Sequence, residues 1–585
     1  MAAQNSTTYY QSLLAPSSLL ILATLLAFLY VAYLRALPKP LAGIPYNEDS
    51  AKRIWGDMPI FREMEKAGIR PRLFWSQLAQ RLQSPVTQFF MGPFYKPMVV
   101  LADWREAQDL LLRRSKNLER GTINNSIWSP VAPEHFISMN SSDPRYKSAR
   151  DLGRDLMTPT FLNTVSAPEI YDKTSKFIEL WDFKARVAEG RPFEAAEDLN
   201  FLTNDIILAA ALGLDDSLSD TTQQLAGLRA KAMPKPPCSS DACFPFPVMQ
   251  GSEALWTSKT LTEGVGRSAT QPSPRLYHFF NNLTPQVRKA YKAKDKILRT
   301  AINGAAQRVE KGEINVRNAV DLMVSREITA ARKAGQSPEL NSLRMHDQLF
   351  GYILGGQDTS HSVLTFLVKW LGARQNEQKA LRDNLRSMHS TACNAGRPPT
   401  TEEIIKTQVP YLDAFIEEVI RMSAPIIVVT TVATADMILL GHFIPKDTVI
   451  WSLISGPTTT EPGFKIPEAE RSESSQKHNE GIADWADSAY APDEFHPERW
   501  LKKRDETGEM SFDSKAGPFL GFSSGPRACW GKRLAYLELR IVITLLTWNF
   551  EFLPLPDEMN GFEAYDLLLA KPKSCFVRLK SNLKD

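Results

Sequence analysis

The sequence predicts a mainly α-helical protein with small β-sheets, an α+β fold, behind one N-terminal transmembrane helix. Three observations lead to this prediction. The chain has 585 residues, 43% of them hydrophobic and 23% charged, which is enough apolar material for one large core. Beyond residue 47 most apolar positions recur with a helical period, and only short runs such as residues 98–101 suit strands. Before residue 35 one apolar run is long enough to cross a membrane.

Composition and charge exclude several classes of function. Lysine and arginine total 69 and aspartate and glutamate total 66, so the net charge is only +3. A dedicated nucleic-acid binder needs a concentrated basic face, so we expect no nucleic acid among the partners. The 5 cysteines are scattered and form no C-x-x-C pair, which argues against both a disulfide framework and a zinc ribbon.

Residues 16–34 predict a membrane anchor of about 28 Å of helix. No basic residue precedes this run, whereas Arg35 and Lys39 follow it, so residues 1–15 are expected in the lumen and the remaining chain in the cytosol. Asn5 heads a glycosylation sequon on the predicted lumenal side, which makes glycosylation an expectation there. The alternative, a buried core helix, fits poorly because the run has no polar face.

The remaining chain reads as a hinge followed by one domain. Residues 35–47 are rich in proline and predict a stiff connection. Residues 233–247 hold prolines that a helix cannot cross, and residues 456–494 predict a long surface loop. Neither segment looks like a domain boundary, so residues 48–585 are expected to form one catalytic domain.

The strongest chemical signal is the run from Phe522 to Gly531, FSSGPRACWG. Gly525 and Gly531 bracket Cys529 and would let the backbone approach a flat ligand without a side chain in the way. Arg527 carries a permanent charge suited to bidentate contact with a carboxylate. An apolar helical pattern follows the cysteine, which places its thiol near a helix N-terminus, where the dipole favours the thiolate.

This run resembles the haem-binding loop of the cytochrome P-450 superfamily, whose pattern is F-x-x-G-x-R-x-C-x-G. The resemblance implies the fold of that superfamily, a triangular, helix-rich haem domain. It also implies haem b as the cofactor, with Cys529 as the axial ligand of its iron and four further haem-binding residues: Phe522, Gly525, Arg527 and Gly531. Trp530 departs from the usual pattern, which has a smaller apolar residue there. The alternative interpretation is a free cysteine buried in a turn.

A second element is predicted as a long helix through residues 349–371. Gly355 and Gly356 stand in its middle, where each costs about 1 kcal/mol relative to alanine, so a close ligand and a locally opened helix are expected. The run resembles the family's [AG]-G-x-[DE]-T-[TS] signature, which implies that Asp358 and Thr359 relay protons to dioxygen and that both glycines make room for it. The alternative is an Asp–Thr pair that bonds its own helix backbone.

A third set of residues is expected to be structural. Glu418 and Arg421 form an E-x-x-R motif, whose members share one face of a helix. Arg499 lies in a later P-E-R-W run, and this order resembles that of the family. The resemblance implies a buried charge triad of Glu418, Arg421 and Arg499 that supports the cysteine loop.

The haem propionates need basic partners, and the sequence offers two candidates. Residues 150–161 resemble the family's W-x-x-x-R helix ahead of P-x-F, with Arg154 in the place of the arginine and Arg150 in that of the tryptophan. Either could bind a propionate, and the alternative is a solvated basic face. Many relatives place a further arginine near what is here Thr431.

The resemblance covers residues 40–580 and is closest to fungal microsomal members, of the type served by a separate reductase. It implies a monooxygenase of the endoplasmic reticulum membrane that hydroxylates or epoxidises an apolar small molecule, often in secondary metabolism. Electrons would come from an NADPH-dependent cytochrome P-450 reductase, with cytochrome b5 as a further candidate donor, because the chain has no G-x-G-x-x-G run of its own. Substrate contacts are expected near residues 120–130 and at five positions: Leu354, Gly355, Ile427, Val428 and Leu568.

Two alternatives remain open. The first is a haem-thiolate isomerase, dehydratase or oxidative-coupling enzyme that inserts no oxygen into its product. The second is a haem-binding protein without enzymatic activity. An intact acid–alcohol pair favours monooxygenation over both.

Overall fold

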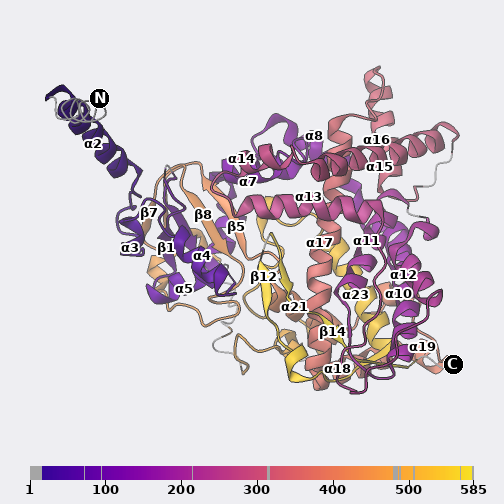
Figure 1. Cartoon of the computed structure of the whole chain (residues 1–585). Helices are drawn as coiled ribbons and strands as arrows, with labels where there is room; N and C mark the ends of the chain where they lie inside the picture. The colour runs from indigo at the N-terminus through magenta and orange to yellow at the C-terminus, as the bar shows by residue number, and fades with distance from the viewer. Residues whose placement is uncertain are drawn as a thin grey trace, which may run out of the picture.

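The computed structural model describes residues 16–70, 73–93, 95–213, 215–312, 316–478, 485, 489–504, 508–566 and 568–582. Its helices surround a central helix on one side, and its largest sheet lies on the other (Figure 1). The predicted class, mainly helical with small sheets, is confirmed.

The helices in the first half of the chain are α2 (Pro16–Ala36), α3 (Glu48–Ala51), α4 (Met58–Lys66), α5 (Leu73–Arg81), α6 (Trp104–Leu112), α7 (Gly121–Trp128), α8 (Pro144–Leu152), α9 (Pro159–Phe161), α10 (Ala167–Ala188), α11 (Ala196–Leu212), α12 (Asp220–Arg229), α13 (Glu253–Ala269) and α14 (Pro274–Asn281). Those in the second half are α15 (Pro285–Glu310), α16 (Ala319–Ala334), α17 (Leu343–Ala373), α18 (Gln375–Met388), α19 (Ser390–Asn394), α20 (Thr401–Lys406), α21 (Pro410–Ser423), α22 (Glu473–Lys477) and α23 (Lys532–Asn549).

The largest sheet has five strands in the order β1-β2-β8-β5-β3: β1 (Val86–Phe89), β2 (Met98–Leu101), β8 (Val449–Leu453), β5 (Val428–Ala433) and β3 (Leu118–Glu119). Strand β2 coincides with the predicted strand 98–101 and pairs with β8 in parallel, whereas the other pairs are antiparallel. Because strand side chains alternate between faces, Val99 and Leu101 join one apolar cluster while Met98 and Val100 join another.

The small sheets are two-stranded. They are formed by β4 (Phe193–Glu194) with β14 (Phe576–Val577), β6 (Met437–Leu439) with β7 (His442–Ile444), β9 (Leu501–Lys503) with β10 (Met510–Phe512), β11 (Phe550–Phe552) with β15 (Leu579–Ser581), and β12 (Ala564–Asp566) with β13 (Ala570–Pro572).

Helix α17 runs through the middle of the helical part of the molecule (Figure 1). It is 31 residues long, and apolar side chains on all its faces are buried against α11, α21 and α23. The Ser360 hydroxyl on α17 donates to Glu538 Oε2 on α23 at 2.8 Å. This bond fixes the spacing between the helix of the expected relay pair and the helix that follows the cysteine loop.

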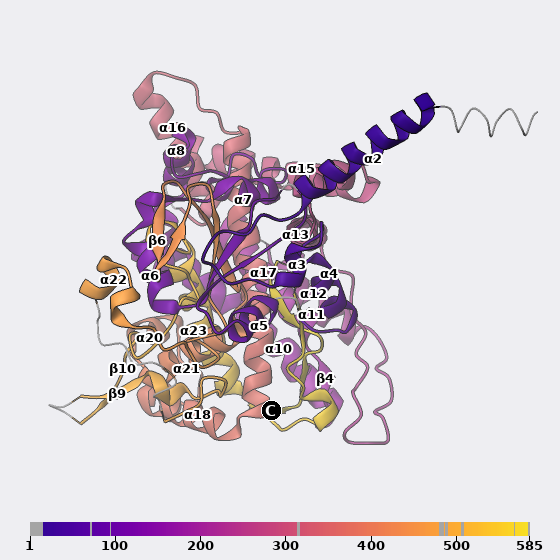
Figure 2. The same cartoon turned by 90° about the vertical axis from the view of Figure 1, so that its left-hand side faces the viewer.

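Helix α2 projects away from the rest of the chain (Figure 2). Its span Leu19–Ala36 has a mean hydropathy of 2.1 and is 0% buried, so by length and composition it could cross a membrane. It extends two residues beyond the predicted end at residue 34. Residues 1–15, which include the Asn5 sequon, lie outside the described residues.

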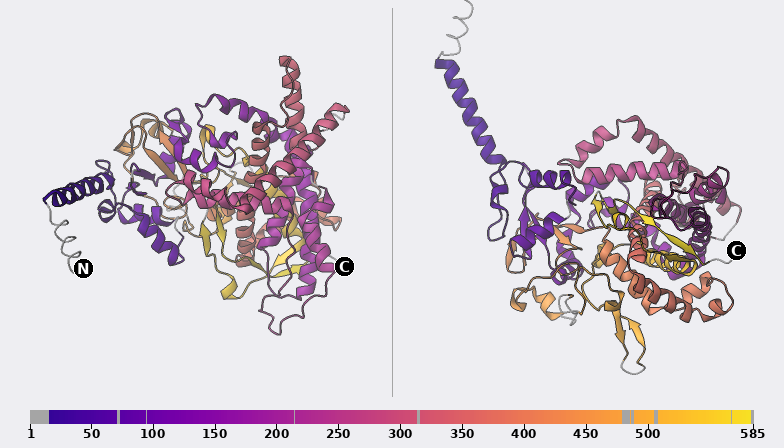
Figure 3. Two further views of the ribbon diagram at one scale, coloured as in Figure 1. Left: turned by 45° about the horizontal axis from the view of Figure 1, so that its top comes forward. Right: turned by 60° about the horizontal axis from the view of Figure 1, so that its bottom comes forward.

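The two predicted loops differ in outcome. No helix crosses residues 233–247, which follow α12 and precede α13 as an extended excursion (Figure 3). The loop of residues 456–494 contains the short helix α22 between its described residues, which the composition of that segment concealed.

Candidate functional site

Cys529 lies in the loop that leads into α23. Its backbone N–H donates to the Phe522 carbonyl at 2.9 Å, which closes the loop around the 3-10 turn Gly525–Arg527. The thiol is exposed on one side, while the protein atoms around it raise its pKa by burial. The N–H groups of Gly531 and Lys532 at the start of α23 and the Lys532 charge act in the opposite direction. The expected effect of the helix start is therefore present but does not exceed the cost of burial in the chain alone.

Glycine stands at positions 525 and 531 of the loop for different physical reasons. Gly525 has φ +73°, and a Cβ there would stand 2.0 Å from the Leu111 carbonyl oxygen at the end of α6. Gly525 is therefore required by its own backbone conformation and by packing against α6, in addition to any contact with a flat ligand. A Cβ at Gly531 would stand 4.0 Å from Cys529 Sγ, so this glycine keeps the surroundings of the thiol open.

Trp530, the departure from the family pattern, packs between two aromatic rings. Its ring meets Phe136 at 5.9 Å and Tyr352 of α17 at 6.1 Å between centroids. Gly153 accommodates it, because a Cβ at that position would stand 3.2 Å from the indole. The larger side chain thus joins the loop to α17 and to the end of α8.

A half-buried basic cluster surrounds Arg527. Its Nη2 donates to the carbonyls of Phe136 and Met139 at 3.2 and 3.0 Å, and its guanidinium lies 4.5 Å over the Tyr146 ring. Arg120 Nη2 donates to the Arg527 carbonyl at 3.3 Å. Arg527 Nη1 and Arg120 Nε are buried without a partner, and neither arginine pairs with a carboxylate within the described part of the chain. Two half-buried positive charges therefore lie close together without a direct ion pair, and Glu119 is the carboxylate whose charge acts on Arg527.

The pKa values of this cluster follow from that arrangement. Burial, followed by the charge of Arg527, lowers the pKa of Arg120 to about 10 and that of His135 to about 3. Burial also lowers the pKa of Arg527. An anion bound between the two arginines would relieve both costs, which makes the cluster a suitable place for a carboxylate-bearing cofactor.

Arg120 lies close to Thr431, the position near which many relatives carry an arginine. Arg120 directly follows β3, whose Glu119 pairs with Val432, the neighbour of Thr431 on β5. Its charge therefore enters the cluster from the adjacent strand. No local motif marks Arg120, and a basic residue directly after a short β-like run is the only signal that the sequence carries.

Of the two predicted propionate ligands, the structure brings only Arg150 to the cysteine loop. Arg150 Nη1 contacts the Tyr146 hydroxyl and the Pro526 carbonyl, both at 3.3 Å. Arg154 is 65% exposed and pairs with neighbouring Asp155 at 3.5 Å. The aromatic-x-x-x-arginine pair at the loop is thus Tyr146 and Arg150, one helical turn earlier than the register in the sequence analysis.

On α17 the expected relay pair is present but is held by other groups. Asp358 Oδ1 accepts from Lys571 Nζ on β13, and the Thr359 hydroxyl donates to the Gly355 carbonyl at 2.6 Å. For Thr359, the alternative of a bond to its own helix is therefore what the structure contains. The helix is continuous, without the expected local opening.

The two central glycines of α17 lie in different surroundings. A Cβ at Gly355 would meet no atom within 4 Å, so this residue borders open space. A Cβ at Gly356 would stand 2.4 Å from Ile207 of α11, so this residue serves helix packing. Only Gly355 leaves room for a small ligand.

Glu418, Arg421 and Arg499 lie together in the interior. The carboxylate of Glu418 accepts from Arg421 at 2.7 and 2.8 Å, from Arg499 Nε at 3.0 Å, and from Trp500 Nε1 at 2.9 Å. Burial opposes its ionisation, but the two arginines hold its pKa below the usual value. Trp500 meets Phe519, just before the cysteine loop, at 5.8 Å. The cluster is thereby joined to that loop.

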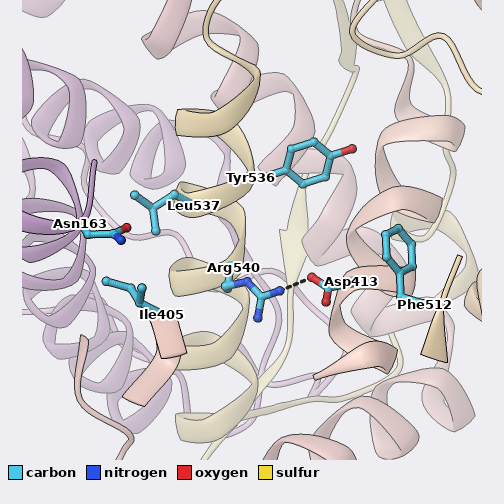
Figure 4. Close-up of a pocket in the computed structure, with 7 residues that line it drawn as sticks. All are labelled: Asn163, Ile405, Asp413, Phe512, Tyr536, Leu537 and Arg540. Atoms are coloured by element: carbon cyan, nitrogen blue, oxygen red, sulfur yellow. Dashed lines mark hydrogen bonds and ion pairs between the residues drawn. The ribbon is translucent and has the colours of Figure 1, made fainter. Parts of the chain in front are cut away.

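The expected substrate residues fall into two groups. Leu354 belongs to the large helical core and Leu568 packs against it, whereas Ile427 and Val428 pack against a second apolar cluster that includes Phe74, Trp75 and Phe89. The Ala570 N–H donates to the Pro425 carbonyl at 3.0 Å, which brings the β12–β13 hairpin beside the start of β5. A cavity of about 390 Å³ beside α23 is lined by none of these residues (Figure 4).

The comparisons with known proteins identify the family. The family model for cytochrome P450 matches residues 58–469 and 490–577. This chain belongs to the cytochrome P450 family. It is 34% identical over 564 residues to cytochrome P450 monooxygenase GME11363 of Pestalotiopsis microspora, covering 95% of this chain and 97% of that protein. Cytochrome P450 monooxygenase TRI13 of Fusarium sporotrichioides is 33% identical over 574 residues, covering 94% and 97%.

A third relative, cytochrome P450 monooxygenase xilC of Penicillium rubens, is 34% identical over 567 residues and covers 96% of both chains. These matches extend over nearly the whole length of named monooxygenases. The P450 described here is therefore a monooxygenase, an oxidoreductase whose family implies a haem cofactor, a redox partner and a small-molecule substrate.

Proposed function

We propose that this P450 hydroxylates or epoxidises an apolar small molecule with dioxygen, using haem b ligated by the Cys529 thiolate. One observation carries the proposal: an open thiol at the start of α23 lies in the same loop as Arg527, which shares half-buried positive charge with Arg120. Haem offers iron to the thiol and carboxylates to the arginines, so the donor set fits the group.

The protein would bind the cofactor at its iron and at its propionates. Cys529 would be the iron ligand, Gly531 keeps its surroundings open, and Arg120, Arg150 and Arg527 would receive the propionates. Phe522 closes the loop through its carbonyl, and its ring packs on Tyr536 at 5.1 Å. When bound, haem supplies the redox-active iron at which dioxygen is activated.

Proton delivery is assigned to Asp358 and Thr359. A hydroxyl can donate and accept at the same time, and that of Thr359 lies against the Gly355 carbonyl, beside the open space that Gly355 borders. Rotation of the Thr359 side chain would turn this hydroxyl from the helix toward that space. Asp358, one residue earlier, would exchange protons with water and so recharge the hydroxyl.

The partners and location follow from the fungal microsomal resemblance and from α2. We assign electron supply to an NADPH-dependent cytochrome P450 reductase, with cytochrome b5 as a further donor. The division into lumenal residues 1–15, an anchor at 16–34, a hinge at 35–47 and a catalytic domain at 48–585 would place the site on the cytosolic face of the endoplasmic reticulum. The exposed apolar surface of α2 supports the anchor.

The substrate is assigned to the apolar products of fungal secondary metabolism. Leu354, Ile427, Val428 and Leu568 offer apolar contacts to such a molecule. These residues carry no charge, so hydrophobic burial would supply most of the binding free energy.

Oxygen-18 labelling tests the reaction type. The purified holoenzyme with reductase and NADPH is incubated under oxygen-18 gas with an apolar extract of the fungal host, and product masses are read. One labelled oxygen atom in each product molecule is expected, since a monooxygenase retains one atom of dioxygen. Products that form without label would instead favour the isomerase, dehydratase or coupling alternative.

A further inference from the structure

The acid of the proposed relay is bonded to a lysine from a distant part of the chain. Lys571 Nζ on β13 donates to Asp358 Oδ1 on α17, across 213 residues of sequence. The two side chains are 22% and 12% exposed, so the pair lies at the edge of the interior, between solvent and α17. Among the described residues, no other hydrogen bond is made to this carboxylate, which leaves Oδ2 free.

The position of Lys571 is fixed by its neighbours. The Ser362 hydroxyl on α17 donates to the carbonyl of Ala570, the residue before Lys571, at 2.5 Å. Ser362 is fully buried and lies one helical turn after Asp358. The N–H of Ala570 donates in turn to the Pro425 carbonyl at 3.0 Å. Strand β13 is therefore attached to α17 whether or not Lys571 is charged.

Lys571 is the residue that pairs with the Asp358 carboxylate, although other ionisable groups lie near the pair. His361 is buried. Burial, followed by the charge of Lys571, lowers its pKa to about 4, so His361 stays neutral and adds no second positive charge beside Asp358. Burial raises the pKa of Tyr565, which stands opposite Lys571 across the hairpin. Lys259, Glu197 and Glu263 complete the charged surroundings.

We propose that Lys571 is a positioning residue for proton delivery: it holds one carboxylate oxygen of Asp358 and leaves the other to exchange protons with water on the path to Thr359. This inference rests on the proposed role of Asp358. A carboxylate without Lys571 would be free to rotate toward the helix backbone or the surface, and the path would then be complete only part of the time.

The same hairpin supplies a matched control. Lys573 is separated from Lys571 by Pro572 and has a different environment, because its Nζ lies 3.3 Å from Glu563 and 3.5 Å from the Gly68 carbonyl at the surface. Substituting either lysine by methionine removes one charge from the hairpin. Only the change at Lys571 removes a partner of Asp358.

The experiment uses the full-length holoenzyme with NADPH-dependent reductase and no added substrate. Under these conditions NADPH, one proton and dioxygen give NADP⁺ and hydrogen peroxide, or two NADPH, two protons and dioxygen give two NADP⁺ and two waters. NADPH and dioxygen consumption are measured in H₂O and in D₂O. In Lys571→Met we expect consumption about fivefold slower and a larger solvent isotope effect, because proton delivery then limits the rate. Lys573→Met should match the parent enzyme.

Two further variants separate positioning from general damage. Lys571→Arg, which keeps a donor, should return the rate to within about twofold of the parent. In the Asp358→Asn background, Lys571→Met should cause no further slowing, because the lysine acts through that carboxylate. If Lys571→Met does not retain haem, Ser362→Ala loosens β13 with the lysine intact and should raise the isotope effect in the same direction.

The outcomes distinguish the inference from the proposal beneath it. If Asp358→Asn alone consumes NADPH at the parent rate with an unchanged isotope effect, the assigned role of Asp358 is wrong, and Lys571 loses its role with it. If Asp358→Asn is slow while Lys571→Met is unchanged, or if the two effects multiply, Asp358 keeps its role and Lys571 does not position it.

Discussion

Two arginine clusters lie beside the cysteine loop, one buried and one half-buried, and they differ in whether a carboxylate neutralises their charge. Arg421 and Arg499 share the carboxylate of Glu418, which also accepts from the indole of Trp500. Arg120 and Arg527 donate to carbonyl oxygens, and neither forms an ion pair with a carboxylate among the described residues. A cluster with its own anion can hold a loop in place by itself, whereas a cluster without an ion pair has positive charge that a bound anion would offset, as in the proposed propionate site.

The largest effect is expected at the paired cluster. Glu418→Gln would leave two buried arginines without a negative partner, which typically costs about 3–5 kcal/mol of unfolding free energy. Urea unfolding at neutral pH measures this loss. The contribution of Glu418 should be fully present above its ordinary pKa and should fade as the pH falls through its lowered folded-state pKa. An unchanged unfolding free energy at neutral pH would mean that this cluster is not a structural support.

A substitution in the cluster of Arg120 and Arg527 should affect haem binding and leave the stability of the fold unchanged. Arg120→Met removes a charge with no carboxylate partner, so circular dichroism should show an intact fold, while haem is lost about tenfold faster because a charge-assisted contact is missing. Transfer of haem to apomyoglobin measures the rate of loss. Arg154→Met is the matched control, since Arg154 is exposed and should leave that rate unchanged. Equal rates in both variants would remove Arg120 from the proposed propionate site.

A smaller effect on stability is expected at Glu538, a buried carboxyl group that has no arginine partner. Its neighbour Ser360 donates to one oxygen while the other has no partner, and burial raises its pKa to about 8. An acid whose folded-state pKa is raised costs stability as the pH climbs from its ordinary pKa toward the raised one. Glu538→Gln should therefore match the parent at pH 5 and be more stable at pH 8. Thermal unfolding at the two pH values checks this, and a parallel pH profile in both proteins would contradict it.

The sequence could predict what depends on local spacing. Three features consist of residues close together in the sequence, so short patterns identify each of them. They are the loop of Cys529, the pair of Glu418 and Arg421, and the strand Met98–Leu101. The identity of the fold followed from the same patterns. These are also the places where backbone geometry, rather than tertiary packing, decides which side chains meet.

Contacts between distant segments could not be predicted in this way. Arg120 meets the Arg527 loop across 407 residues, and Lys571 reaches Asp358 across 213. Gly356 looked like part of a ligand site because its partner Ile207 belongs to another helix. The register of Arg150 was missed because Tyr146 stands where the pattern expects tryptophan.

The central claim is that Cys529 is the thiolate ligand of haem iron, and the spectrum of the reduced carbonyl complex tests it most directly. Cys529→Ala should abolish the red-shifted Soret band of that complex, because no other thiol lies in this loop. The same substitution at exposed Cys238 or Cys393, at partly buried Cys243, or at buried Cys575 should preserve the band. A Cys529→Ala protein that keeps the red-shifted band would contradict the account.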